Sequence, residues 1–495
     1  MIRASLVGLT LCCAAIAARA YTPLVHDPSV GINSIRHGGT EGYVAHWDLA
    51  AYPDGAIEYY VNPRFPEGVE PFASTEAVLS AVQRAFATWE DVPGCAVRFH
   101  YAGPTDETDA FDGRNVVTFT PSYKMPEGFA GAVFPAAWYS EREGPVAELG
   151  GLFTASRPGQ TVDCDVTWFP GAATALQEAG SPPDSLSFRG ILVHEIGHML
   201  GLDHSGLGQT TMYAYATMGR AFTNERLSED DTTGISTLYP EPEFLASHGR
   251  IAGTVFDKDG KPLAGASVVA VEADTGVAHS STITGLATLR PDGMPDRYSL
   301  SSGEFLVVVP PGKYALLVEP FGAPAQGMPY LSGIFGAASG KASFLRTDFG
   351  PEITDTPIEV PAGGSIGGIS IAVGPLSDSS PVLGRTACWR WQADANAWSS
   401  PARIRQGEDA TMTFAAGVNI VGPGALADGL NARFLGPGLS VSGTQTDPNG
   451  ERLSLVVSAA ADAPVGPRVL EVRTAAGVTY FPGAVAVLAG NRQGR

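Results

Sequence analysis

The stretch LVHEIGHMLGLDHS constrains this chain more than any other part of its sequence, because it spaces His194, His198 and His204 in register. On an α-helix, residues four apart lie one turn apart on the same face, so His194 and His198 can hold one cation between them. Gly201 can adopt a positive φ, which lets the chain leave the helix and bring His204 back as a third ligand. We therefore expect a helix that ends at Gly201, followed by a returning loop.

The same stretch predicts a hydrolytic zinc site. Three neutral imidazoles leave one position of a tetrahedral zinc ion open for water. Glu195 projects about 100° away from His194 around the helix axis, which places it to reach that water rather than to ligate on the same face. Zinc would lower the pKa of the water to about 7, and Glu195 would take its proton as a general base. The alternative is an intact site in a protein that no longer cleaves anything.

The stretch resembles the zinc helix of the metzincin metallopeptidases and, within them, of the matrixins. Met212 follows the last histidine by eight residues and corresponds to the family's Met-turn, while Leu227–Tyr239 resembles its closing helix. The Ala-Phe-x-x-Trp run that ends at Trp89 also fits, so the resemblance covers about residues 47–240. It implies an α+β zinc peptidase domain with a twisted mixed sheet plus helices. In that domain the three histidines bind zinc, Glu195 is catalytic and Met212 forms a hydrophobic floor.

Two departures from the family bear on latency and metal content. Matrixin zymogens carry a Pro-Arg-Cys-Gly segment, whereas no cysteine lies between Tyr21 and Trp47, so thiol latency is not predicted. The animal enzymes hold a structural zinc on additional histidines, whereas none lies between Ala130 and Phe169. We therefore expect one catalytic zinc and no structural zinc.

The resemblance also implies a calcium site and a substrate-binding edge. Family members bind calcium through carboxylates, for which Asp163 and Asp165 are the candidates, with ordinary solvated acids as the alternative. Substrate is expected to lie antiparallel to an edge strand, for which residues 130–139 are the candidate. Residues 213–218, after the Met-turn, should form a wall of the pocket beside the scissile bond.

Hydrophobic periodicity in the first half of the chain predicts a sheet covered by helices. Apolar residues at i, i+3 and i+4 indicate an amphipathic helix over 74–92, and the histidine-bearing helix is expected over 185–200. Strands are expected over residues 56–61, 96–101, 115–120, 130–139 and 162–169.

Further along, the sequence changes to short β-like runs separated by Gly, Pro and Asp turns. Residues 249–375 resemble the carboxypeptidase regulatory-like (transthyretin-like) β-sandwich through Gly253-Thr-Val, the run Asp259–Val268 and the turn Pro311–Tyr314. Residues 381–490 are Ig-like in their pattern of short strands and turns. We therefore expect a multidomain chain in which two all-β sandwich domains follow the peptidase domain.

The two sandwiches are expected to act either as spacers or as modules that bind a surface or a polymer. Trp389, Trp391 and Trp398 form an aromatic cluster in the sequence, which suits sugar or polymer binding. Packing of these rings in a hydrophobic core is the alternative.

The N-terminal residues predict export. Residues 1–20 have a positive start, a short apolar run and an Ala-Arg-Ala cleavage site, which makes them a signal peptide with Tyr21 as the mature N-terminus. An N-terminal anchor is the alternative. Residues 21–46 show no periodic pattern and are expected to form a short, loose segment.

Three cysteines remain after the signal peptide. Export permits disulfides, and Cys95 and Cys164 would lie in the same domain, so a bond between them is expected. Two buried free thiols are the alternative. Cys388 is left over, either free or in an intermolecular bond.

Charge and hydropathy limit the partners. Lys and Arg number 31 against 51 Asp and Glu, which gives a net charge of −20 and excludes a nucleic-acid partner. No later run reaches the roughly 18 apolar residues of an integral membrane segment. The sequence thus predicts a secreted zinc endopeptidase, extracellular or periplasmic in transit, that acts on protein or peptide substrates. The alternative is an extracellular adhesive or binding protein with a vestigial protease domain.

Overall fold

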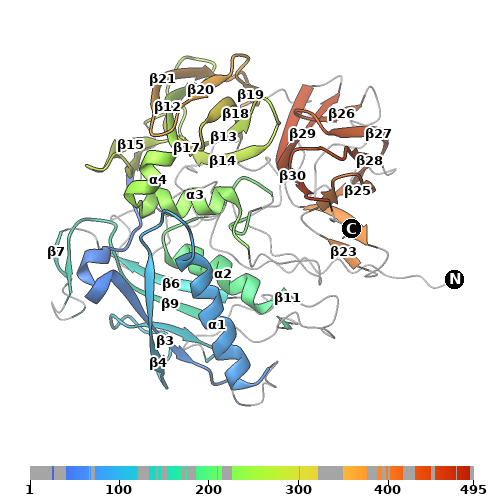
Figure 1. Cartoon of the computed structure of the whole chain (residues 1–495). Coiled ribbons are helices and arrows are strands. Elements are labelled where there is room, and N and C mark those ends of the chain that lie inside the picture. Colours follow the sequence, from blue (N-terminus) through green and yellow to red (C-terminus); the bar gives the residue numbers. More distant parts are fainter. Residues whose placement is uncertain are drawn as a thin grey trace.

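The fold is described from a computed structural model of the chain (Figure 1). The expected signal peptide and Tyr21 lie outside the residues that it describes. The structure describes residues 25–26, 41–65, 67, 73–120, 133–140, 143–146, 149, 153–168, 174–175, 186–203, 205–208, 210–213, 226–299, 301–320, 349–375, 387–392, 397–399, 402–415, 430–446, 452–474 and 477–490.

A five-stranded twisted sheet forms the first half of the molecule, in the order β4-β3-β5-β9-β6. Neighbouring strands are parallel except for β6, which runs antiparallel to β9 at one edge. Every residue of β9 is buried, as expected for a strand that is covered on both faces. The strands are β3 (Ala56–Asn62), β4 (Arg98–Pro104), β5 (Asn115–Thr118), β6 (Val133–Tyr139) and β9 (Thr161–Trp168).

Two helices pack together beside this sheet (Figure 1). Helix α1 (Thr75–Glu90) is capped by the Ser74 hydroxyl and buries an apolar face, and helix α2 (Phe188–Met199) carries the histidines. The Trp89 indole N–H of α1 donates to the Val193 carbonyl of α2 over 2.7 Å, which fixes the two helices against each other. Both expected helices are confirmed, with α2 beginning three residues later than predicted.

Short elements connect this framework. Helix α3 (Glu229–Leu238) and helix α4 (Pro242–Ser247) follow α2. The remaining short elements are η2 (Leu49–Ala51), η3 (Pro53–Gly55), β7 (Gly144–Pro145), β8 (Thr154–Ala155), β10 (Thr174–Ala175) and β11 (Leu186–Ser187).

The rest of the described chain is mainly β-structure, which confirms the expected change to short β-strands. Sheet β17-β12-β21 and sheet β14-β13-β18-β19, in which β20 also pairs with β18, share one hydrophobic core. Their strands are β12 (Gly249–Phe256), β13 (Ala266–Glu272), β14 (Ala278–Ile283), β17 (Glu304–Val309), β18 (Gly312–Pro320), β19 (Glu352–Ile353), β20 (Ile358–Val360) and β21 (Ser365–Ala372).

Two further sheets, β23-β22-β25-β28-β27 and β24-β30-β29-β26, enclose a separate core. Trp391 of β22 pairs in register with Trp398 of β23, while the side chains of the three tryptophans and of Cys388 lie outside the description. The strands are β22 (Ala387–Gln392), β23 (Ala397–Ser399), β24 (Ala402–Arg405), β25 (Asp409–Ala415), β26 (Asn431–Phe434), β27 (Leu439–Thr446), β28 (Arg452–Ala459), β29 (Gly466–Thr474) and β30 (Gly477–Leu488).

The segment before the first sheet is not wholly loose, contrary to the sequence-based expectation. Strand β2 (Glu41–Val44) pairs with β1 (Val25–His26) and with β16 (Pro295–Ser299), and β16 continues to β15 (Leu286–Leu289). The side chain of Tyr298 in β16 joins the hydrophobic core of the first sheet. The first half and the following β-structure therefore share both a sheet and a core.

The expected disulfide is wrong, because Cys95 and Cys164 are both free and buried. Cys95 precedes β4 and Cys164 lies in β9, and strands β3 and β5 run between them. Three steps of about 4.8 Å separate the two strands by about 14 Å, whereas a disulfide needs Cα atoms within about 7 Å. Burial raises the pKa of the Cys95 thiol to about 12, so this thiol is inert at neutral pH.

Candidate metal centre

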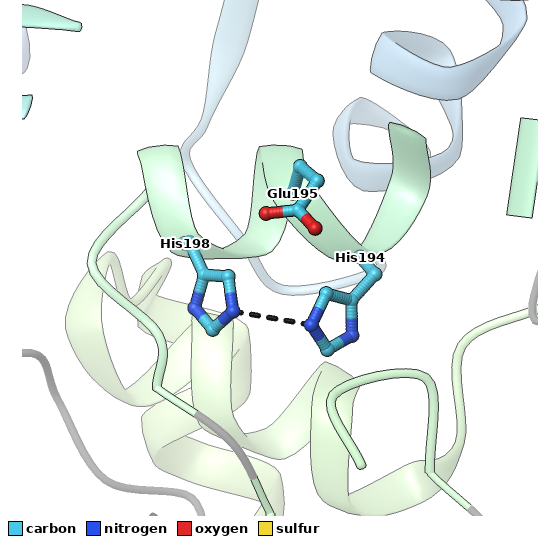
Figure 2. Close-up of side chains that lie close together, drawn as sticks. All are labelled: His194, Glu195 and His198. Atoms are coloured by element: carbon cyan, nitrogen blue, oxygen red, sulfur yellow. Dashed lines mark hydrogen bonds between the residues drawn. The ribbon is translucent and has the colours of Figure 1, made fainter. Parts of the chain in front are cut away.

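The first two predicted ligands face each other on helix α2. Figure 2 shows His194 and His198 on the same side of the helix, as their spacing of four residues requires. The two Nε2 atoms are 3.1 Å apart and the ring planes are perpendicular. The Ser187 hydroxyl caps the N-terminus of the helix by accepting a hydrogen bond from the Gly190 N–H over 3.1 Å.

Backbone carbonyls determine which ring nitrogen of each histidine carries the proton. The Nδ1 atom of His194 lies 2.7 Å from the carbonyl oxygen of Thr211, and that of His198 lies 2.8 Å from the carbonyl oxygen of Leu202. Because a carbonyl oxygen only accepts, both Nδ1 atoms donate. Burial lowers the pKa of His194 to about 4 and that of His198 to about 3, so both rings are neutral at pH 7. Each Nε2 atom therefore carries a lone pair.

This arrangement fits a metal cation such as zinc. Two lone pairs that face each other over 3.1 Å repel, and a cation between them turns the repulsion into ligation. Two nitrogens at 2.0–2.1 Å from one tetrahedral zinc ion lie about 3.3 Å apart, close to the separation observed here. A carbonyl partner on the other ring nitrogen is the usual support of a metal-binding histidine.

Glu195 lies beside the same point. Its carboxylate and the two histidine rings place one potential ligand atom each within 4.8 Å of one another, and Figure 2 shows the carboxylate near both rings. The side chain is buried, and burial raises its carboxyl pKa well above the ordinary range. A neighbouring cation acts in the opposite direction, because it favours the charged carboxylate.

The third predicted ligand, His204, lies outside the described residues. The structure does describe how the chain leaves the helix just before it. Gly201 has φ of +97°, and its N–H donates to the His198 carbonyl over 2.9 Å. The N–H of Leu202 donates to the Gly197 carbonyl over 2.9 Å, and the helix ends just before the predicted glycine. The structure thus brings together His194, Glu195 and His198, and the role of His204 stays a prediction.

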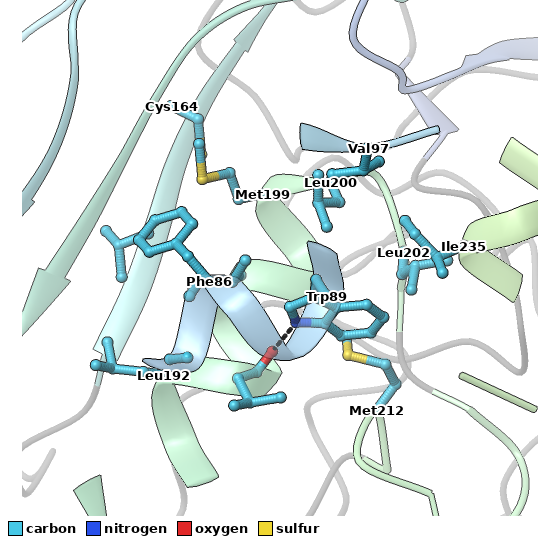
Figure 3. Close-up of a cluster of buried hydrophobic side chains, with 14 of the residues drawn as sticks. Phe86, Trp89, Val97, Cys164, Leu192, Met199, Leu200, Leu202, Met212 and Ile235 are labelled. Atoms are coloured by element: carbon cyan, nitrogen blue, oxygen red, sulfur yellow. Dashed lines mark hydrogen bonds between the residues drawn. The ribbon is translucent and has the colours of Figure 1, made fainter. Parts of the chain in front are cut away.

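Met212 packs beneath the histidine-bearing helix. Figure 3 shows its sulfur beside the Trp89 indole. A Cβ atom on Gly197 would overlap the Met212 sulfur and lie 2.8 Å from the Trp89 ring, so only glycine fits at that position. The Ser205 N–H donates to the Met212 carbonyl over 2.7 Å, which joins the Met212 turn to the chain after His204. The predicted hydrophobic floor matches this packing.

The comparison with known families agrees with this geometry. The family profile described as matrixin, of peptidase family M10, matches residues 56–240. Residues 56–240 are a matrixin domain.

Relatives of the matrixin domain are distant in sequence. Metalloendoproteinase 2-MMP of Arabidopsis thaliana is 28% identical over 204 residues, which cover 41% of this chain and 46% of that protein. Macrophage metalloelastase of Oryctolagus cuniculus is 27% identical over 44% of this chain and 39% of that protein. Stromelysin-1 of Equus caballus is 28% identical over 44% of this chain and 38% of that protein. The chain therefore spans less than half the length of these relatives.

Sequence reasoning missed what Asp231 does in the matrixin domain. Its carboxylate accepts hydrogen bonds from the backbone N–H groups of Thr211 over 2.8 Å and Met212 over 3.0 Å. The same carboxylate accepts from the Ser228 N–H over 2.7 Å in the capping box of α3. Asp231 thus holds both the Met212 turn and the Thr211 carbonyl that accepts from His194. The capping box is a local pattern that can be recognised in the sequence. The hydrogen bonds to Thr211 and Met212 join residues far apart in the chain, and no sequence pattern indicates them.

The two candidate calcium ligands of the matrixin domain accept hydrogen bonds from the backbone, and their role toward calcium stays a prediction. Asp163 and Asp165 are buried, so the alternative of ordinary solvated acids is wrong. The Asp163 carboxylate accepts from the N–H groups of Asp112 and Gly113 over 2.8 and 2.6 Å. The Asp165 carboxylate likewise accepts from the N–H groups of Ala110 and Val116, over 2.8 Å each. Both side chains tie the loop before β5 to strand β9, and Asp165 also accepts from β5 itself.

Proposed function

We propose that this chain is a secreted zinc endopeptidase in which His194, His198 and His204 bind one zinc ion and Glu195 is the general base. The observation that carries the proposal is the pair of Nε2 lone pairs that face each other over 3.1 Å beside the Glu195 carboxylate. The family of residues 56–240 supports it, since the relatives are named as metalloendoproteinases and a metalloelastase.

The proposed reaction is hydrolysis of a peptide bond. When bound, zinc supplies the Lewis acidity that polarises the scissile carbonyl and acidifies the attacking water. Glu195 takes a proton from that water while the water oxygen attacks the carbonyl carbon. The C–N bond then breaks, and Glu195 returns the proton to the leaving amine. The burial of Glu195 excludes bulk water from this transfer, and the helix holds its carboxylate beside the two histidines.

We further propose that substrate binds along strand β6. Within the described residues, β6 pairs with β9 on one side and has no strand on the other. An extended peptide can add to such an edge through backbone hydrogen bonds. The predicted pocket wall has Tyr213 as its only described residue, since residues 214–218 lie outside the description.

Residues 249–375 and 381–490 are proposed to form two β-sandwich domains. Each has its own pair of sheets and its own hydrophobic core. They are proposed as the part of the molecule that binds a surface or a polymer.

Removal of the metal is expected to abolish peptide cleavage. Excess o-phenanthroline should eliminate hydrolysis of casein or gelatin by the purified chain, because the two histidines alone cannot acidify water at pH 7. Stoichiometric zinc, added after the chelator is removed, should restore the activity. Metal content by mass spectrometry should read one zinc per chain. Cleavage that continues unchanged in the chelator would contradict the proposed function.

Secretion is proposed from residues 1–20, and processing at Ala20 gives the test. The exported protein should have Tyr21 at or near its N-terminus by intact-mass measurement. Protein that retains residues 1–20 after export would contradict the signal peptide and support the N-terminal anchor. Within the described residues, no helix is long and apolar enough to cross a membrane.

A further inference from the structure

The short segment Ser205–Gly208 directly follows the proposed third ligand, His204, and is buried throughout. Its first residue is held within the matrixin domain, where the Ser205 hydroxyl donates to the Asp230 carboxylate over 2.6 Å. The rest of the segment contacts the β-structure that comes later in the chain. Whatever fixes this segment also limits where the preceding residue can go.

Leu207 is the hydrophobic anchor of this segment. Its side chain has no exposed surface, and it belongs to a cluster whose other members come from outside the matrixin domain. Those members lie on strands β13, β14 and β18 of residues 249–375, the second part of the chain, and on strands β29 and β30 of residues 381–490, the third part. They are Val269, Val271, Ala278, Leu317, Val469 and Tyr480. Both later parts of the chain therefore supply the site into which Leu207 inserts.

Gly208 continues this contact through the backbone. Its N–H donates to the Pro482 carbonyl of β30 over 3.1 Å. A Cβ atom at this position would lie 2.8 Å from the Gly483 carbonyl oxygen and 3.1 Å from the Phe481 ring. The segment thus runs directly against the last strand of the chain, with no room for a side chain.

A second link reaches the same segment through Asp230. While Ser205 donates to one carboxylate oxygen of Asp230, the other oxygen accepts from the Ser281 N–H over 2.7 Å and from the Ser281 hydroxyl over 3.1 Å. Ser281 lies on strand β14. Next to this link, the His279 ring contacts the Glu229 carboxylate over 2.8 Å. Helix α3 and strand β14 are therefore joined by two adjacent polar contacts beside the segment.

We propose that Leu207 is a positioning residue, through which the two later β parts hold the segment after His204 and so fix the approach of this ligand to zinc. The inference rests on the proposed function for the identity of the metal site. Metal sites lose affinity when the groups that orient their ligands are removed, typically by 10- to 100-fold. The matrixin domain would then depend on the rest of the chain for a complete metal site.

The test compares two leucine truncations in the full chain. Leu207→Ala removes the anchor, whereas Leu316→Ala removes an equally buried leucine that belongs to the core of residues 249–375 and not to the Leu207 cluster. Both should lower the melting temperature similarly. Only Leu207→Ala should release zinc about 10- to 100-fold faster to a chromogenic chelator and lower kcat for a fluorogenic peptide with little change in KM. Leu207→Met, which keeps a large apolar side chain, should keep the zinc release rate and kcat close to the wild-type values.

The outcomes separate the two proposals. Equal zinc release from Leu207→Ala and Leu316→Ala would overturn the positioning role, whether release is slow in both or fast in both. Wild-type chain that binds zinc but cleaves nothing would overturn the proposed function alone, since zinc release still reports on the segment. If Leu207→Ala does not fold, the milder Val469→Ala, at another member of the same cluster, should release zinc faster than wild type. Unchanged release from Val469→Ala would then contradict the inference.

Discussion

Replacement of Glu195 by glutamine is expected to lower kcat/KM for peptide cleavage by about 10²- to 10⁴-fold while zinc stays bound. Glutamine keeps the size and the hydrogen-bonding oxygen of the side chain but cannot take a proton from water. The Nε2 atoms of His194 and His198 and their carbonyl partners are untouched by the substitution. The loss should therefore fall on the proton transfer and leave metal affinity unchanged.

A matched variant makes this result specific. Glu76→Gln changes an exposed carboxylate on α1 and should leave kcat/KM and zinc content at the wild-type values. The measurements are hydrolysis of a fluorogenic peptide and zinc per chain on the same samples. If Glu195→Gln retained activity, the base would be misassigned. If it lost zinc together with activity, Glu195 would be acting on the metal and not on the proton. Wild-type chain that binds zinc yet never cleaves would favour the adhesive-protein alternative.

Substitution of Gly201 by alanine is expected to destabilise the matrixin domain by about 4 kcal/mol and to remove zinc binding with it. The left-handed φ of +97° is unfavourable for alanine, at about 1–3 kcal/mol. The added Cβ would also overlap the backbone carbonyl oxygen of Ala45, which has little freedom to move because Ala45 is fully buried. Overlap of this kind adds about 1–3 kcal/mol. The loop toward His204 could then no longer leave α2 at the same point.

Gly260 offers the control for the conformational part of this cost. It has a similar φ of +74°, but a Cβ atom there would meet nothing within 4 Å. Gly260→Ala should therefore show only the backbone penalty and retain full zinc binding. The measurements are urea denaturation for the free energy of unfolding and zinc content of the folded fraction. Equal destabilisation by the two substitutions would show that the Ala45 contact contributes nothing.

Local patterns predicted the elements that position the candidate metal site. The apolar spacing before Trp89 predicted helix α1, and the spacing of His194 and His198 predicted that both rings share a face of α2. The end of that helix was predictable as well, because Gly201 adopts a positive φ, which glycine tolerates and which depends on a single residue. Each of these predictions depends on neighbours within one or two turns of the chain, which is why a sequence is enough to make them.

The errors concern pairs of residues that are far apart in the sequence. Whether Cys95 meets Cys164 depends on strand order, which places two strands between them. The acids Asp163 and Asp165 look like surface residues in the sequence, but they are buried and accept N–H groups from the loop before β5 and from β5 itself. The anchoring of Leu207 needs the fold of residues more than sixty positions away. No periodicity records such contacts.

The pairing of β2 with β16 has a consequence for the order in which the protein can be made. Residues 41–44 emerge from the ribosome long before residues 295–299, and the pairing cannot form until the later strand exists. The core of the first sheet is likewise incomplete until Tyr298 has been added to it. If the chain is exported from its N-terminus as proposed, the first domain would cross the membrane unfinished, and its assembly would be completed only on the far side.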